Sequence, residues 1–341
     1  MARMACGTQI RLGSPARRTS CDRRRPSSYR NAPNAMTDQA SLASLASLPS
    51  QDPEFYDREY NNRANVPDNP AHMARWAQWS AEVRERGGFL ADLSYAGACA
   101  RHPQDQTLDY FPAQRANGSL PPLLVFVHGG YFRALDKRDH SFVASVLPAL
   151  GVAVAVVNYS LVPSVTVPEI VRQVLDSVAW LYRESDQFGH DPDRLFVAGH
   201  SVGGHLVAML MAARWPELGA DLPVDLVKGG LSVSGLYDME PLRRAAFLQC
   251  DLRLSEEDVA RLSPAFMPPA GAAPLALAVG ELEADEYQRQ HALMRAAWPA
   301  NVGHPAASDI VLPGCHHFNV LDGFSEADST LTRAVLRLMG R

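Results

Sequence analysis

Short apolar runs alternate with amphipathic stretches along most of the chain, and this alternation constrains the fold more than any other feature. Each run is typical of a buried strand, and the stretches between the runs carry apolar residues at helical spacing. The predicted strands cover residues 89–96, 106–113, 123–128, 152–159, 194–199, 228–235, 274–280 and 309–314. The predicted helices cover residues near 70–86, 168–185, the segment after Ser201, 285–298 and 327–339. Apolar strands separated by helices predict an α/β fold, with a mostly parallel central sheet and helices on both faces.

The two ends of this pattern determine the predicted domain organisation. Residues 1–35 hold eight arginines and one acid, a charge of +7, which leaves −12 on the rest of a chain with a net charge of −5. A segment so rich in Arg, Ser and Pro buries too little apolar surface to fold, so we expect residues 1–50 to be a disordered tail and linker. We interpret the tail as an over-extended gene start with Met36 as the true start, and a transit peptide or a basic interaction arm are the alternatives. The rest is predicted to be one domain, 51–341, with an N-terminal helical segment at 55–87 and a Pro-rich, cap-like excursion at 236–274.

Composition limits the partners and the compartment that we expect. Outside the tail the chain is acidic, which argues against a nucleic-acid partner. The sequence lacks an uncharged apolar run of membrane-spanning length and an N-terminal apolar signal segment, so we expect no membrane partner and a cytoplasmic location. The five cysteines are widely spaced and form no CxxC, so they are interpreted as free thiols. No dinucleotide or P-loop glycine motif is present, so we expect a small-molecule substrate with no cofactor and no metal; the oligomeric state is not predicted.

The motif GHSVG, residues 199–203, places a serine between two glycines at the junction of a predicted strand and a predicted helix. This is the context that the G-x-S-x-G elbow of a nucleophilic serine requires, because the chain turns so sharply there that a Cβ beside the serine would clash. The same pattern also fits a glycine-rich turn with a passive serine. The other strand ends must therefore decide whether Ser201 is a nucleophile.

Polar residues follow three further strands, at the edge of the sheet where ligands bind in such folds. His128 and two glycines follow one strand, an acidic loop follows another, and His316 and His317 follow the last. A serine nucleophile needs a histidine to accept its proton, and that histidine needs an acid to hold its tautomer. The chain order serine, acid, histidine is that of the α/β-hydrolase fold, so we predict a Ser-His-acid triad.

Two of the three triad positions have more than one candidate. For the base we favour His317, with His316 as the alternative; a metal pair formed with Cys315 lacks further ligands at suitable spacing. For the acid we favour Glu283, while Asp285 is the shorter and commoner triad acid but stands where the next helix begins.

Backbone amides around Ser201 are predicted to form the oxyanion hole. Val202 follows the nucleophile at the start of a helix, and Gly129 and Gly130 allow the preceding loop to turn its amides, including that of Tyr131, inward. His128 is expected to order this loop rather than transfer protons. His200 and His205 are interpreted as structural.

The segments YDREYNNRANVPD, HGGYFRALDKRDHSFVA, GHSVGGHL, GELEADEYQRQ and HHF together resemble the arylformamidase (kynurenine formamidase) branch of the α/β hydrolases, which is close to the HGGG-bearing, hormone-sensitive-lipase-like esterases. The resemblance spans residues 54–339. It implies Ser201 as nucleophile, Glu283 as acid and His317 as base, with the HGGY loop as oxyanion hole. The family usually carries aspartate as its acid, so Glu283 is a departure that keeps Asp285 as a candidate.

The resemblance implies the substrate N-formylkynurenine, which the family cleaves to formate and kynurenine. A carboxylesterase acting on short acyl or aryl esters is the alternative, and a ligand receptor without turnover is a third hypothesis, because a fold alone does not fix an activity. Tyr237, Phe247 and Phe266 of the excursion are candidates for the substrate pocket. Each of them could instead pack the excursion against the sheet.

Overall fold

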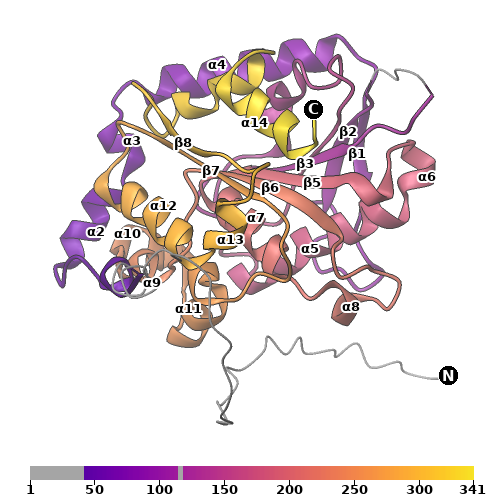
Figure 1. Cartoon of the computed structure of the whole chain (residues 1–341). Helices are drawn as coiled ribbons and strands as arrows, with labels where there is room; N and C mark the ends of the chain where they lie inside the picture. The colour runs from indigo at the N-terminus through magenta and orange to yellow at the C-terminus, as the bar shows by residue number, and fades with distance from the viewer. Residues whose placement is uncertain (1–41, 114–117) are drawn as a thin grey trace, which may run out of the picture.

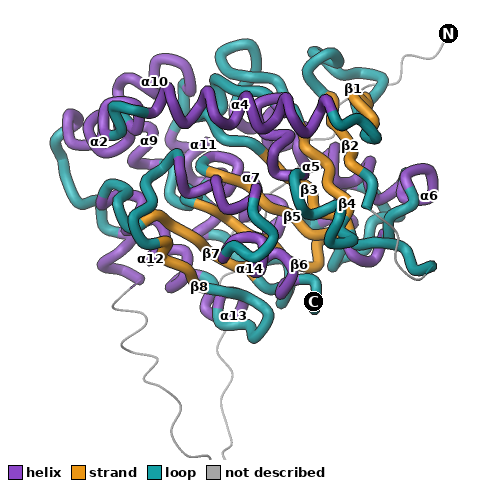
Figure 2. The backbone as a smooth tube through the Cα atoms, turned by 90° about the horizontal axis from the view of Figure 1, so that it is seen from above, coloured by secondary structure: helices purple, strands orange, loops and turns teal. Residues whose placement is uncertain are grey.

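The computed structural model describes residues 42–113 and 118–341 and contains an eight-stranded sheet with the strand order β1-β2-β4-β3-β5-β6-β7-β8. The strands are β1 (Leu90–Ser94), β2 (Thr107–Phe111), β3 (Leu123–Val127), β4 (Ala153–Val157), β5 (Leu195–His200), β6 (Val227–Val233), β7 (Leu275–Gly280) and β8 (Asp309–Leu312). β3 to β8 run parallel, and β2 is antiparallel to both β1 and β4. Each strand overlaps one of the eight predicted runs. The prediction of an α/β fold with a mostly parallel sheet is therefore confirmed. Figure 2 shows the strands of this sheet side by side among the helices.

Helices cover both faces of the sheet (Figure 1). The longer helices are α4 (Asn69–Glu85), α5 (Val167–Arg183), α7 (Val202–Ala212), α12 (Asp285–Ala297) and α14 (Thr330–Leu338). Shorter ones are α2 (Pro53–Tyr60), α3 (Asn62–Asn65), α6 (Ser185–Phe188), α8 (Trp215–Leu218) and α13 (Pro299–Val302). α5 begins at a complete capping box, in which Thr166 and Glu169 each bond the other's backbone amide. None of the described helices is long and apolar enough to cross a membrane.

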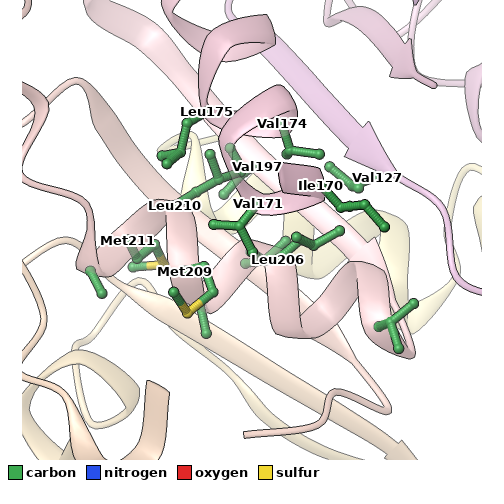
Figure 3. Packing of buried hydrophobic residues seen from close by; sticks show 14 of the residues in the cluster. Val127, Ile170, Val171, Val174, Leu175, Val197, Leu206, Met209, Leu210 and Met211 are labelled. Carbon is green, nitrogen blue, oxygen red and sulfur yellow. The ribbon is translucent and has the colours of Figure 1, made fainter. Parts of the chain in front are cut away.

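The central strands are buried on both faces, and their side chains alternate between two hydrophobic clusters. Val125 and Val127 of β3 belong to the cluster that α5 and α7 cover, whereas Leu124 and Phe126 belong to the cluster under α4 and α14. Figure 3 shows the first cluster, where side chains of α5 and α7 meet beside the sheet. This double coverage explains why these strands are continuous apolar runs rather than alternating ones.

The excursion between β6 and β7 is largely helical. It holds α9 (Glu240–Arg244), α10 (Ala246–Leu252) and α11 (Glu256–Leu262). The first two of these helices pack against α2, so the excursion and the N-terminal segment lie side by side. This contact brings two parts of the chain that are distant in sequence to the same end of the sheet.

The N-terminal part of the predicted tail and linker, residues 1–41, lies outside the described residues, as does Met36. Residues 42–46 are helical, and Leu42, Leu45 and Leu48 pack against the core. The Leu45 carbonyl accepts a hydrogen bond from Arg289 of α12 at 2.6 Å. The end of the segment expected to be a linker is thus ordered on the domain, because its leucines bury apolar surface there.

Candidate active site

Ser201 lies at the sharp turn between β5 and α7, as the sequence predicted for its motif. Its backbone has φ 58° and ψ −123°, a left-handed conformation that is strained for a residue with a side chain. The flanking glycines permit this turn: a Cβ on Gly203 would lie 2.1 Å from the Val127 carbonyl oxygen, and one on Gly199 would lie 2.3 Å from the Gly203 carbonyl oxygen. Ser201 is buried and lines a cavity at the carboxyl end of the strands.

His317 lines the same cavity and follows β8 on a short loop. Its Nδ1 lies 2.7 Å from Oε2 of Glu283, and the side chains of both residues are almost fully buried. Because the carboxylate can only accept, Nδ1 carries the proton and Nε2 keeps its lone pair in the neutral ring. This is the tautomer that a general base next to a serine needs.

Glu283 is held by two further hydrogen bonds. Its Oε1 accepts from the Ser234 hydroxyl at 2.5 Å and from the Gly280 amide at 2.8 Å. The glutamate side chain therefore folds back onto the strand end that precedes it, which places its outer oxygen on His317. Asp285 is exposed at the first position of α12, and within the described part of the chain no hydrogen bond or ion pair joins it to a histidine. Of the two candidate acids, the structure brings only Glu283 to the base.

His316 faces away from Glu283. Its Nδ1 accepts from the Phe318 and Asn319 amides at 3.2 and 3.3 Å, and its ring packs edge-on against His72 of α4, 4.6 Å between centroids. Asp68, His72 and His316 lie close enough to share a metal ion. However, both ring nitrogens of His72 are already engaged, one by Asp68 at 3.3 Å and the other by the Arg75 guanidinium at 2.5 Å. A cation there would have to displace a positive charge, so this cluster fits a hydrogen-bonded surface contact better than a metal site.

The loop after β3 carries the residues expected to form the oxyanion hole. Gly130 has φ 103°, and a Cβ there would lie 2.1 Å from the Ala134 carbonyl oxygen, so only glycine fits. Tyr131 and Phe132 also have positive φ, 51° and 59°. Gly129 packs closely against Ser201, because a Cβ on Gly129 would lie 3.1 Å from the Cβ of the serine. Among the described residues, the amides of Gly130, Tyr131 and Val202 donate to no protein acceptor. Val202 also opens α7, at the positive end of its dipole.

His128 orders this loop, as expected from the sequence. Its Nδ1 bonds the Gly129 carbonyl at 2.8 Å, and its ring stacks on Tyr159 with 4.3 Å between centroids. Burial lowers the pKa of His128 to about 4, so the ring is neutral near pH 7. His205 is similarly buried, with Nε2 2.7 Å from the Leu262 carbonyl oxygen, as expected of a structural histidine.

A hydroxyl network that the sequence analysis missed lies beside Ser201. The Tyr131 hydroxyl donates to the Tyr60 carbonyl at 2.7 Å and lies 2.6 Å from the Tyr287 hydroxyl. Asn62 donates to both phenol oxygens, at 2.9 Å and 2.7 Å. Burial raises the pKa of Tyr287 above its ordinary value, while hydrogen bonds from its neighbours, the Ser201 hydroxyl among them, act in the opposite direction.

Tyr287 lies close to His317. It stands in the first turn of α12, which begins two residues after Glu283. Its ring lies 4.5 Å from that of His317. His200 is the other missed residue: its ring is 4.6 Å from that of His317 and it lines the cavity rather than serving only the core.

The cavity has a volume of about 340 Å³ and two main walls. The first, called here the sheet wall, comes from loops at the strand ends and consists of Gly130, Tyr131, His200, Ser201, His317 and Phe318. The second, called the cover, comes from the N-terminal segment and consists of Tyr60, Asn61, Asn62, Arg63, Met73 and Trp76. Of the three aromatic candidates in the excursion, Phe247 lines the cavity. Tyr237 is buried against Ser232, and Phe266 is 53% exposed; neither lines this cavity.

Comparison with known proteins agrees with this architecture. Residues 124–288 match a family described as having the alpha/beta hydrolase fold. The chain has the α/β-hydrolase fold. It is 29% identical to the kynurenine formamidase of Salmo salar, over 84% of this chain and 95% of that protein, and 25% identical to the kynurenine formamidase of Danio rerio, over 80% and 89%.

A solved structure from Silicibacter sp. tm1040, named as a candidate thioesterase, is also similar to this hydrolase. Its TM-score is 0.69 at 28% identity, and the match covers 82% of this chain and 98% of that one. Shorter stretches, 35 to 47% of the chain, match curated esterases and the hormone-sensitive lipase of Mus musculus. The predicted resemblance to arylformamidases and their esterase neighbours is therefore confirmed.

Proposed function

We propose that this hydrolase removes the formyl group from N-formyl arylamines, with N-formylkynurenine as its substrate, through Ser201, His317 and Glu283. The observation that carries the proposal is the hydrogen-bonded pair of Glu283 and His317 in one cavity with a serine at a strained turn. Relatives named kynurenine formamidase that match over most of this chain support the choice of substrate.

In the proposed mechanism the Ser201 hydroxyl attacks the formyl carbon while Nε2 of His317 takes its proton. Glu283 holds the opposite ring nitrogen and stabilises the imidazolium that forms. Negative charge develops on the formyl oxygen, where the amides of Gly130, Tyr131 and Val202 are the available donors. One such donor contributes about 3 to 4 kcal/mol to the stabilisation of a transition state of this kind.

The second half of the reaction uses the same groups. The imidazolium of His317 gives its proton to the departing arylamine, which leaves a formyl ester on Ser201. His317 then takes a proton from water as the water attacks this ester, and it returns that proton to the Ser201 oxygen as formate leaves. An arylamine is a better leaving group than an alkylamine, so a serine hydrolase suits this formamide.

We further assign the cavity to a single domain, residues 51–341, in which the N-terminal segment 55–87 and the excursion 236–274 form the walls opposite the strand ends.

A carboxylesterase acting on short acyl or aryl esters is the second candidate function, favoured by the matches to curated esterases. Both reactions need the same nucleophile, base and oxyanion donors. They differ in the leaving group that the cavity must hold.

Purified protein assayed on N-formylkynurenine, p-nitrophenyl acetate and p-nitrophenyl butyrate tests the proposal. We expect a kcat/KM of about 10⁴ M⁻¹s⁻¹ or more on the formamide, within the usual range for enzymes. Fast ester cleavage with negligible formamide turnover would make the protein a carboxylesterase with the same triad. Failure of a fluorophosphonate probe to label Ser201 in folded protein would support a receptor without turnover.

A further inference from the structure

The charge inside the cavity is opposite to that of the rest of the domain. Residues 36–341 carry a net charge of −12, yet no aspartate or glutamate is among the residues that line the cavity. Two arginines, Arg63 and Arg133, do line it. A cleft with positive side chains in an acidic protein concentrates the field at its mouth and attracts anions there.

The two arginines differ in what they bind. Arg133 lies 2.8 Å from both the Asp251 carboxylate and the Phe247 carbonyl oxygen, and its guanidinium lies 5.3 Å from the centroid of the Phe247 ring. Its charge is compensated by Asp251. Its role is therefore to hold the excursion against the cavity.

Arg63 has no such partner. Within residues 42–113 and 118–341, its guanidinium forms no ion pair and no hydrogen bond, and the residue is exposed. Its backbone, in contrast, is fixed: its carbonyl accepts from Asn69 at 2.9 Å, and its neighbour Asn62 is bonded to Tyr131 and Tyr287. The side chain is thus a free cation on an anchored helix turn.

We propose that Arg63 binds a carboxylate of the substrate, remote from the scissile carbonyl, so that the site prefers anionic aryl formamides and esters over neutral ones. The inference rests on the proposed function of the Ser201 site. A guanidinium presents five donors in a planar fork that matches a carboxylate, and such charge-assisted bonds are stronger than neutral ones. Trp76 and Phe247, which also line the cavity, offer apolar faces to the aryl part of the same molecule.

Two matched pairs of substrates test this preference. The first is N-formylkynurenine and its carboxamide, which differ in the carboxylate alone. The second is the p-nitrophenyl monoester of adipic acid and the same compound methylated on its free carboxyl group. We expect kcat/KM to favour the acid of each pair by about tenfold, the size of one charge-assisted hydrogen bond. The preference should shrink with added salt, because Arg63 is exposed and screening is effective there.

The variant Arg63→Gln should bring the ratio within each pair close to one, and Arg63→Lys should restore part of it. Arg58→Gln is the matched control, since it removes the same charge from the neighbouring helix α2, where Arg58 lies 3.7 Å from Asp52. The control should keep the preference for the acid. Equal rates on acid and neutral partner in the wild type, or a ratio that Arg63→Gln leaves unchanged, would overturn the inference.

The ester pair separates failure of this inference from failure of the proposed function. If neither formamide reacts but the adipate pair shows a preference that depends on Arg63, the formamidase proposal fails and the carboxylate site stands. If N-formylkynurenine and its carboxamide react equally well, the formamidase proposal stands and the carboxylate site fails. Absence of turnover on every substrate would reject both.

Discussion

The two walls of the cavity are built in different ways. The sheet wall depends on backbone geometry: a serine in a left-handed conformation, glycines whose Cβ atoms would collide with carbonyl oxygens, and loops that leave the strands at one edge. The cover depends on side-chain hydrogen bonds between distant segments, such as those of Asn62 to Tyr131 and Tyr287, 69 and 225 residues away. Local turns therefore fix the positions of the reacting groups, whereas hydrogen bonds between distant segments fix the shape of the cavity around them.

The largest expected effect lies on the sheet wall. Ser201→Ala should abolish hydrolysis, with a loss of about 10⁶-fold in kcat as for removal of a serine nucleophile elsewhere. The melting temperature should change little, because one hydroxyl at a turn is removed and no cavity is opened. Single-turnover assays and thermal denaturation of the same preparation measure both effects. Turnover retained in this variant would reject the sheet wall as the reacting side.

A second pair of variants tests which acid supports His317. Glu283→Gln replaces the carboxylate by an amide, which disfavours the working tautomer of the histidine and should lower kcat by about 10⁴-fold. Asp285→Asn serves as the control. Asp285 is exposed at the first position of α12, two residues after Glu283, and this variant should retain nearly full activity. Steady-state kinetics at pH 7.5 measure the two changes. A larger loss in Asp285→Asn would reverse the assignment.

The cover is tested by removing a hydroxyl from the network that joins it to the sheet wall. Tyr287→Phe keeps the ring against His317 but loses the contacts to Tyr131, Asn62 and the Ser201 hydroxyl. We expect kcat/KM to fall about tenfold, corresponding to one hydrogen bond. Tyr95→Phe is the control, since its buried hydroxyl donates to the Asn158 carbonyl at 2.5 Å. Both variants should lose similar stability, and only Tyr287→Phe should lose activity. Equal activity in the two would show that the walls work independently.

The buried histidines affect the stability of the fold rather than the reaction itself. Burial lowers the pKa of His128, His140 and His205 to about 4 in the folded chain, against an ordinary value near 6.5. The unfolded chain then binds more protons than the folded one, so stability is constant above about pH 6.5 and falls as the pH drops toward 4. At pH 5 each histidine lowers the free energy of unfolding by roughly 2 kcal/mol. Urea denaturation at pH 7.5 and pH 5 measures this, and equal stabilities would contradict it.

The contrast between the walls also explains what the sequence could predict. All eight strands and the position of Ser201 at a turn follow from local patterns of apolar residues and glycines, and these patterns act over a few residues. The choice between Glu283 and Asp285 needed the structure, because both stand in one short loop and only the fold-back of Glu283 onto Gly280 decides which reaches His317.

The cover could not be predicted in the same way. Asn62 and Tyr287 are unremarkable in the sequence, and their roles arise only when α3 and α12 are brought together on the sheet. The helix predicted near 70–86 corresponds to α4, yet its amphipathic pattern does not tell that Trp76 faces the cavity. Long-range side-chain pairs leave no periodic trace in a single sequence.

The cover is supplied by one continuous stretch of chain that precedes the sheet's central strands. The residues that match the family, 124–288, include Ser201 and Glu283 but exclude Arg63 and Trp76. Mutations that accumulate in residues 53–85 can therefore change which molecules enter without altering the nucleophile or its acid. Exchanging this stretch for that of a relative would therefore alter the outer wall of the cavity while leaving the nucleophile and its acid in place.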